Sequence, residues 1–186
     1  MAVGFILDFP GATTEQYDRV IERMDLGGKL PPGAVFHAAG ATPEGLRVVD
    51  VWESDEAYQR FAEESIGPHT QAEGIGEPKV TRVAEHRIGD LRDQGGDITF
   101  LQVVHLDLDA EGFDSADSEI RGGEWPEGIV FHVTGPSNGE WIVADGWTSK
   151  ELRDRFMQER VGPVMGERGL APPTVDEMAV HNTLAP

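Results

Sequence analysis

Two histidines occupy matching places in the chain. His37 lies in the segment PGAVFHAAG (32–40), and His132 lies in the similar segment EGIVFHVTG (127–135). Histidine is the side chain best suited to proton transfer near neutral pH. Both are therefore candidate general bases that could deprotonate a phenol or an enolisable diketone. The alternative is a histidine that packs in the core and donates to a backbone carbonyl.

Two aspartates recur in the same way. Asp50 falls in VVDVWES and Asp145 in VADGWTS, two segments with the composition of strands. Asp is unfavourable inside a strand, so its presence in both segments needs a cause. One interpretation is a carboxylate near a cleft that orients a histidine or holds a proton. The other is an acid that accepts hydrogen bonds from a loop, or that pairs with an arginine such as Arg60 or Arg155.

Aromatic residues accompany these polar groups. Each aspartate precedes a tryptophan by two residues, so strand alternation places both members of the pair on one face. By the same alternation, His37 and His132 share a face with Val35 and Val130. A flat aromatic substrate could stack on the tryptophans, although large aromatic residues at strand ends often serve in packing. The expected substrate-binding residues are Trp52, Trp147, Phe36, Phe131, Phe61, Phe156 and Tyr58.

The motifs belong to a longer repeat with one spacing. Positions 37 and 50 recur at 132 and 145, and the match continues from Gly67-Pro68 to Gly162-Pro163. Such self-similarity indicates two copies of one unit. We predict a first unit over 1–88 and a second over 98–186. The segment 89–97 (GDLRDQGGD) has a single apolar residue and is typical of a linker.

Both copies contain the same expected elements. Helical spacing of Tyr17, Val20, Ile21 and Met24 predicts the first helix. Ser54 and Ser149 are expected N-caps of the second helix in each copy, which Gly-Pro then ends. Strands are expected over 3–9, 34–39, 46–53, 98–106, 129–134 and 140–148, with a last strand after Pro78 or Pro173.

The resulting order, β-α-β-β-α-β twice, is the ferredoxin-like split arrangement. Each unit then has a four-stranded sheet with helices on one face only. Packing the two sheets face to face would bury the other faces. We therefore predict an α+β protein made of two ferredoxin-like units packed sheet to sheet.

A unit with VFH in the second strand, D-x-W-x-S closing the third and G-P after the second helix resembles the dimeric α+β barrel superfamily. More narrowly, the chain is similar to its antibiotic-biosynthesis-monooxygenase-like branch. Members usually form homodimers of single units, so the resemblance implies a barrel within one chain and a monomer or weak homodimer. Haem-degrading members carry an Asn on the first strand, where this chain has Asp8 and Gln102, which argues against that activity.

The resemblance implies an enzyme that acts on a small molecule without a cofactor. A monooxygenase acting on an aromatic or polyketide-like substrate is the leading hypothesis. His37 or His132 would be the base, and Asp50 or Asp145 the orienting carboxylate. A polyketide cyclase or isomerase with the same base is the alternative. A non-enzymatic ligand-binding or structural barrel is the third.

Composition excludes several other classes. The chain has 34 acidic and 15 basic residues, a formal net charge of −19, which repels nucleic acids and anionic membranes. There is no long apolar run, and the first residues are typical of a strand rather than a signal peptide. With no cysteine there is no disulfide or thiolate site. No metal, nucleotide or flavin motif is present, so we expect no cofactor and a cytoplasmic protein.

Overall fold

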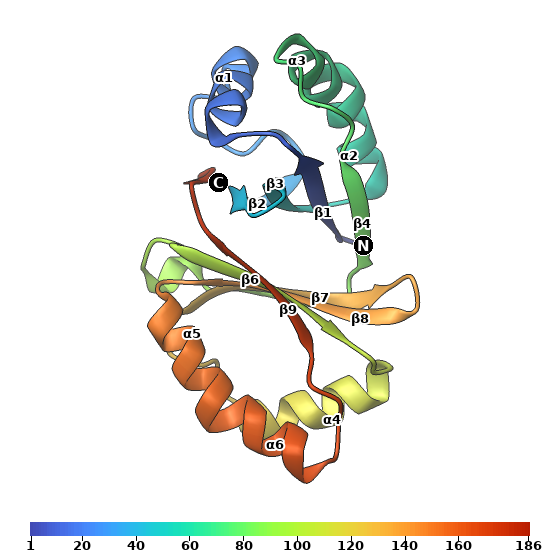
Figure 1. Ribbon diagram of the computed structural model, residues 1–186, viewed down its shortest axis with the longest axis vertical. Helices are drawn as coiled ribbons and strands as arrows, with labels where there is room; N and C mark the ends of the chain where they lie inside the picture. Colours follow the sequence, from blue (N-terminus) through green and yellow to red (C-terminus); the bar gives the residue numbers. More distant parts are fainter. The chain divides into compact units, whose positions relative to one another are not determined.

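The computed structural model describes the backbone of residues 1–186 and all side chains except that of Gln94. The chain forms two compact units, one of Met1–Ala84 with Met178–Pro186 and one of Glu85–Glu177. Each unit has an α+β fold with one five-stranded antiparallel sheet and helices on one face of it (Figure 1). The α+β class and the predicted order of elements in each half are confirmed. A duplication as their origin stays a prediction.

The first sheet has the strand order β10-β2-β3-β1-β4. Helices α1, α2 and α3 cover one of its faces (Figure 1). Its elements are β1 (Val3–Pro10), α1 (Thr14–Met24), β2 (Ala34–Thr42), β3 (Gly45–Trp52), α2 (Asp55–Phe61), a π-helix (Ala62–Ile66), α3 (Gly67–Ala72), β4 (Lys79–Ala84) and β10 (Asn182–Thr183).

The second sheet has the order β5-β7-β8-β6-β9, with α4, α5 and α6 on one face (Figure 1). Its elements are β5 (Arg87–Asp90), a 3-10 helix (Arg92–Gln94), β6 (Phe100–Leu106), α4 (Ala110–Arg121), β7 (Ile129–Ser137), β8 (Glu140–Trp147), α5 (Lys150–Phe156), a π-helix (Met157–Val161), α6 (Gly162–Glu167) and β9 (Thr174–Ala179).

Each sheet has one strand more than predicted. The chain that follows the last strand of each half continues into a short strand of the other unit: β5 pairs with β7, and β10 pairs with β2. An edge strand has unpaired N–H and C=O groups, and these segments pair with part of that edge. Gly89 and Asp90 therefore belong to a strand, in register with His132 and Phe131, and not to the predicted linker.

The second helix of each unit begins as predicted and ends differently. Ser54 Oγ accepts a hydrogen bond from the Ala57 N–H at 3.2 Å, and Ser149 Oγ accepts one from Leu152 at the same distance. The Gly-Pro pair does not break the helix. Gly67 keeps helical dihedrals, and its N–H bonds to the Ala62 carbonyl five residues earlier. The helix continues through a π-helical turn over Ala62–Ile66. This turn lies just before Pro68, which has no N–H to donate.

The inner face of the first sheet packs against its helices. Alternation along β3 brings Val48 and Trp52 into this core, as predicted, together with Phe5, Leu7 and Tyr17. The matching core of the second unit contains Val104, Phe113, Trp141 and Val143. Both candidate aspartates lie on these inner faces, so the sheet and helices of each unit enclose the polar groups in apolar surroundings.

The N-caps give the first testable prediction. Replacing Ser54 or Ser149 with Ala removes the acceptor of a helix N-terminal N–H, and we expect each change to cost about 0.5–2 kcal/mol of unfolding free energy. Urea titration followed by circular dichroism measures the loss. The Thr148→Ala variant changes the residue beside one cap and leaves the cap oxygen in place, so it is the control. A cap variant no less stable than its control would contradict the assignment.

Glu73 joins α1 to the end of α3 and gives a prediction on pH. Its carboxylate binds Arg19 and Arg23, each at 2.6 Å, and these bonds, the one from Arg19 first, lower the pKa of Glu73. A lowered pKa stabilises the fold above the unfolded-state pKa, and the gain is lost as pH falls through the folded-state value. We expect Glu73→Gln to lower the melting temperature at pH 7, with the difference shrinking below about pH 4. A difference that grows in acid would contradict this.

Candidate functional site

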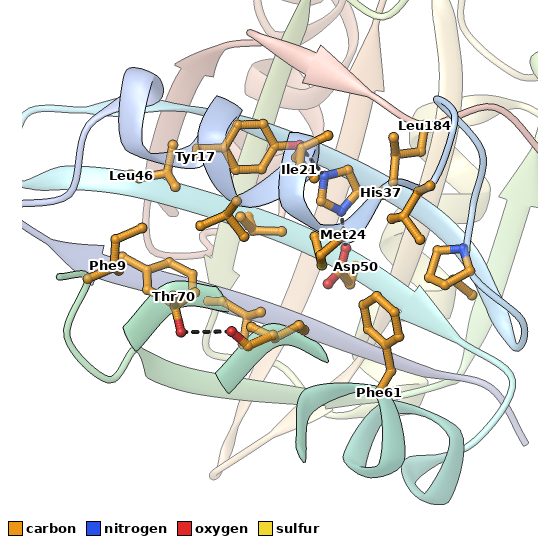
Figure 2. A pocket seen from close by; sticks show the side chains of 18 of the residues that line it. Phe9, Tyr17, Ile21, Met24, His37, Leu46, Asp50, Phe61, Thr70 and Leu184 are labelled. Atoms are coloured by element: carbon orange, nitrogen blue, oxygen red, sulfur yellow. Dashed lines mark hydrogen bonds and ion pairs between the residues drawn. The ribbon is translucent and has the colours of Figure 1, made fainter. Parts of the chain in front are cut away.

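A histidine and an aspartate face each other on neighbouring strands in each unit. His37 on β2 is the register partner of Asp50 on β3, and His37 Nδ1 lies 2.7 Å from Asp50 Oδ1 (Figure 2). The same pair recurs in the second unit, where His132 Nδ1 lies 2.7 Å from Asp145 Oδ1. An ionised carboxylate only accepts hydrogen bonds, so Nδ1 carries a proton in both rings.

All four side chains are nearly buried. The exposed fractions are 12% for the side chain of His37 and 6% for that of Asp50, and 6% and 8% for His132 and Asp145. A buried carboxylate without a partner is costly, and the imidazole N–H supplies that partner. The aspartates thus hold a histidine, the first of the two interpretations, while Arg155 pairs with Glu127 instead.

A β-bulge precedes each histidine. The register of β2 against β3 shifts between Ala34 and Phe36, and that of β7 against β8 shifts between Ile129 and Phe131. Each shift places one additional residue, Val35 or Val130, in the first strand of the pair. Bulges re-aim the side chains beside them, and Ala34 thereby lines the same cavity as His37 although three positions separate them.

In the first unit the hydrogen-bonded chain extends beyond the histidine. His37 Nε2 lies 2.7 Å from the Tyr17 hydroxyl on α1, and Asn182 Nδ2 donates to the same hydroxyl oxygen at 2.8 Å. Tyr17 therefore donates its proton to Nε2. Burial raises the pKa of Tyr17, and the nearby Asp50 carboxylate raises it further, against the effect of Asn182. The phenol stays protonated and can pass a proton between its neighbours.

In the second unit the dyad has different neighbours. Gln102 on β6 donates from Nε2 to Asp145 Oδ2 at 3.0 Å. In the first unit Phe5 holds the corresponding register position, opposite Asp50. No tyrosine reaches His132, and its Nε2 has no hydrogen-bond partner among the described residues. Nε2 of the dyad histidine is thus hydrogen-bonded in the first unit and has no partner among the described residues in the second.

Each dyad lies in the wall of an apolar cavity that belongs to its own unit. The first cavity has about 620 Å³ of space, its mouth included, and Figure 2 shows Tyr17, His37 and Asp50 among its apolar walls. Leu7, Phe9, Leu46, Val48, Phe61 and Leu184 are among its apolar lining residues. The second has about 700 Å³, its mouth included, and its polar lining residues are Gln102, His132, Asp145, Asp117 and Arg121 among mostly apolar ones. Largely apolar walls with a few converging polar groups are typical of small-molecule sites.

The predicted aromatic residues divide into two groups. Trp52 and Phe61 line the first cavity, and Phe156 lines the second. The other four lie elsewhere: Trp147 packs on Phe156 at 5.6 Å between ring centroids, and Tyr58 stacks on Phe5 at 3.8 Å. Phe36 and Phe131 directly precede the histidines on their strands and are 2% and 1% exposed, so alternation turns them to the opposite face of the sheet.

Four residues of the two sites were not among the predicted ones. Tyr17 bonds to His37, Asn182 donates to the Tyr17 hydroxyl, Gln102 donates to Asp145, and the Trp125 ring lies 5.2 Å from that of His132. One signal was present, since the alignment of the two copies slips by a residue so that Tyr17 matches Phe113. The hydroxyl is therefore present in only one of the two units.

Among the residues that the structure describes, no three His, Cys, Asp or Glu side chains are grouped so as to hold a metal ion. No helix in the described part of the chain has the length and apolar character needed to cross a membrane.

The fold resembles that of several solved structures. A protein from Fusobacterium nucleatum subsp. nucleatum, described as a candidate monooxygenase, matches with a TM-score of 0.76 and 11% identity over 99% of this chain and 94% of its own. An anthrone oxidase-like protein matches with a TM-score of 0.52 and 18% sequence identity, over 98% of this chain and 92% of its own. A chlorite dismutase variant from Candidatus Nitrospira defluvii matches with a TM-score of 0.61 and 12% sequence identity, over 100% of this chain and 91% of its own.

These likenesses establish the fold alone, and at such identities they establish no activity. No family model matches the chain. No curated protein matches it either. The function is therefore argued from the site.

The tyrosine contact gives a prediction on stability. Tyr17→Phe leaves His37 Nε2 and the Asn182 amide without the hydroxyl that joins them, so we expect a loss of about 1–3 kcal/mol of unfolding free energy in urea at pH 7. Phe113→Tyr, at the matching position of α4, is the comparison variant and removes no existing hydrogen bond. A Tyr17→Phe protein as stable as the parent would show that the hydroxyl contributes nothing to this network.

Proposed function

We propose that the chain is a cofactor-independent monooxygenase that oxidises an aromatic or polyketide-like small molecule in the cavity of the first unit. The observation that carries the proposal is the buried chain from Asp50 through His37 to the Tyr17 hydroxyl, which ends in an apolar cavity. Such a chain can remove a proton from a substrate that has no water beside it.

The proton follows a defined path. The tyrosine oxygen donates to His37 and accepts from Asn182, so one lone pair is left to accept from a substrate O–H or acidic C–H. When the substrate proton moves to this oxygen, the tyrosine proton moves to His37 Nε2. Asp50 stabilises the imidazolium that forms. The result is an electron-rich substrate anion in contact with apolar walls.

Molecular oxygen is the co-substrate of the proposed reaction. A CH₂ group activated by neighbouring carbonyl or aromatic groups loses two hydrogens and becomes a carbonyl. One atom of O₂ enters the product, and the other leaves as water with those two hydrogens, so the atoms and electrons balance. Trp52 and Phe61, which line the same cavity, provide aromatic surface for a flat substrate.

Two lines of support favour this reaction class. The apolar cavity and its single polar face suit a largely apolar molecule with one acidic group. The fold is shared with an anthrone oxidase-like protein and with a candidate monooxygenase. Of the two dyads, we assign the base to His37, because its relay to the cavity is complete.

The test compares the two histidines. With anthrone and related tricyclic ketones as probes, we expect the protein to consume O₂ and to convert the ring CH₂ group into a second carbonyl. His37→Ala should reduce turnover by about a hundredfold or more, the usual scale for a lost proton-transfer group. The change also removes the partner of the buried Asp50 and lowers stability, so turnover is compared at a temperature at which circular dichroism shows the variant folded. His132→Ala is the matched control from the other unit and should retain most of the rate.

Three results would count against the proposal. The first is no O₂ consumption with any compound of the panel. The second is conversion of a probe without O₂ uptake, which would indicate a cyclase or isomerase that uses the same base. The third is a larger loss of turnover in His132→Ala than in His37→Ala, which would move the base to the second unit.

A further inference from the structure

The second unit has two buried acceptor atoms that nothing in its own structure satisfies. His132 Nε2 and Gln102 Oε1 have no hydrogen-bond partner among the described residues, and the two residues are only 5% and 2% exposed. Both residues line the same cavity. Leaving a buried polar atom unpaired costs free energy, so two of them at one cavity point to a missing partner.

Asp145 sets the hydrogen-bonding character of both atoms. Its Oδ1 takes the Nδ1 proton of His132 at 2.7 Å, and its Oδ2 takes the amide N–H of Gln102 at 3.0 Å. In the neutral imidazole, Nε2 is then the lone-pair nitrogen, and Gln102 keeps its carbonyl oxygen as the free acceptor. Both atoms therefore need a hydrogen-bond donor.

The first unit shows which kind of group fits at the histidine. There the Tyr17 hydroxyl donates to His37 Nε2 at 2.7 Å. Phe113 holds the corresponding place on α4: its ring lies 6.3 Å from that of His86, edge to face, as Tyr17 lies 6.1 Å from His181. The second unit thus lacks the hydroxyl.

A second exchange between the units adds an acceptor. Gln102 lies opposite Asp145 where the first unit has Phe5 opposite Asp50. Relative to the first unit, the second cavity lacks a hydrogen-bond donor and has an additional acceptor. Both differences leave it with acceptors that need a donor.

The rest of the cavity wall is mostly apolar and aromatic, and the ion pair of Asp117 and Arg121 also lines it. Trp125 lies 5.2 Å from the ring of His132, and the guanidinium of Arg121 lies 4.6 Å from the Trp125 ring. Val104, Leu106, Phe113, Phe156 and Met165 are among the other lining residues. A ligand here needs an apolar, preferably aromatic, body.

We infer that the cavity of the second unit is a separate binding site for a small aromatic molecule with two neighbouring hydrogen-bond donors, such as an ortho-dihydroxyarene. One donor bonds to His132 Nε2 and the other to Gln102 Oε1, while the ring packs beside Trp125. The site differs from the proposed catalytic one, which presents a tyrosine oxygen, so each unit selects a different ligand.

Calorimetry on the whole chain under anaerobic conditions tests the inference, with three probes of one shape: 2,3-dihydroxynaphthalene, 2-naphthol and naphthalene. We expect the dihydroxy compound to bind about tenfold more tightly than 2-naphthol, since each hydrogen bond adds about this factor. Gln102→Leu should bring its affinity to the level of 2-naphthol. Phe5→Leu, at the corresponding position of the first unit, is the matched control and should leave this tenfold ratio unchanged.

A second measurement covers the case in which the variants fail to fold. In the parent protein, binding of 2,3-dihydroxynaphthalene should shift the ¹⁵N resonance of His132 Nε2. Equal affinity for the three probes, or a shift confined to His37, would overturn the inference. Binding is measured without O₂ or turnover, so failure here leaves the proposed oxidation at His37 unaffected, and failure of that oxidation leaves this site standing.

Discussion

A histidine and an aspartate bonded across two antiparallel strands set the chemistry of both units. Each aspartate is buried in the middle of a strand, where an isolated carboxylate would be strongly destabilising. The imidazole N–H at 2.7 Å satisfies it, and the same contact fixes which nitrogen of the ring carries the proton. Nε2 then points toward the cavity side of the sheet as an acceptor. The group that bonds to Nε2 therefore distinguishes the two units.

The two dyads have different hydrogen-bonding neighbours. In the first, the Tyr17 hydroxyl is bonded to Nε2 and oriented by Asn182, a residue from the far end of the chain. In the second, Phe113 replaces the tyrosine, and Gln102 binds the aspartate from the neighbouring strand. The same pair thus lies in two cavities with different linings. We propose that one cavity contains a proton relay and that the other is selective for a different ligand.

Much of this arrangement could be predicted from the sequence because it is local. Alternation in β3 places Asp50 and Trp52 on one face, and Ser54 and Ser149 sit before helices where only a cap explains them. The pairing of His37 with Asp50 follows from two strands of one hairpin. The aromatic predictions were less successful because strand alternation turns Phe36 and Phe131 to the face opposite the histidines that follow them.

Contacts between distant segments could not be predicted. Asn182 meets Tyr17 across 165 positions, and β5 and β10 are short strands whose partners lie far away in sequence. The sequence of β10, two residues long, has no periodicity to detect. Helical spacing correctly places the ring of Tyr17 on the apolar face of α1. The partner of its hydroxyl oxygen depends on how that helix lies over the sheet, which the spacing does not give.

Nitrogen-resolved NMR of the imidazole rings tests the central claim most directly. The account predicts a protonated Nδ1 in both His37 and His132, each with a far-downfield proton signal. That signal should be lost from His37 in Asp50→Asn and from His132 in Asp145→Asn, with no effect on the other ring. Long-range ¹H–¹⁵N correlation on the parent protein and the two variants gives the answer. An unprotonated Nδ1 with the proton on Nε2, in either ring of the parent protein, would contradict it.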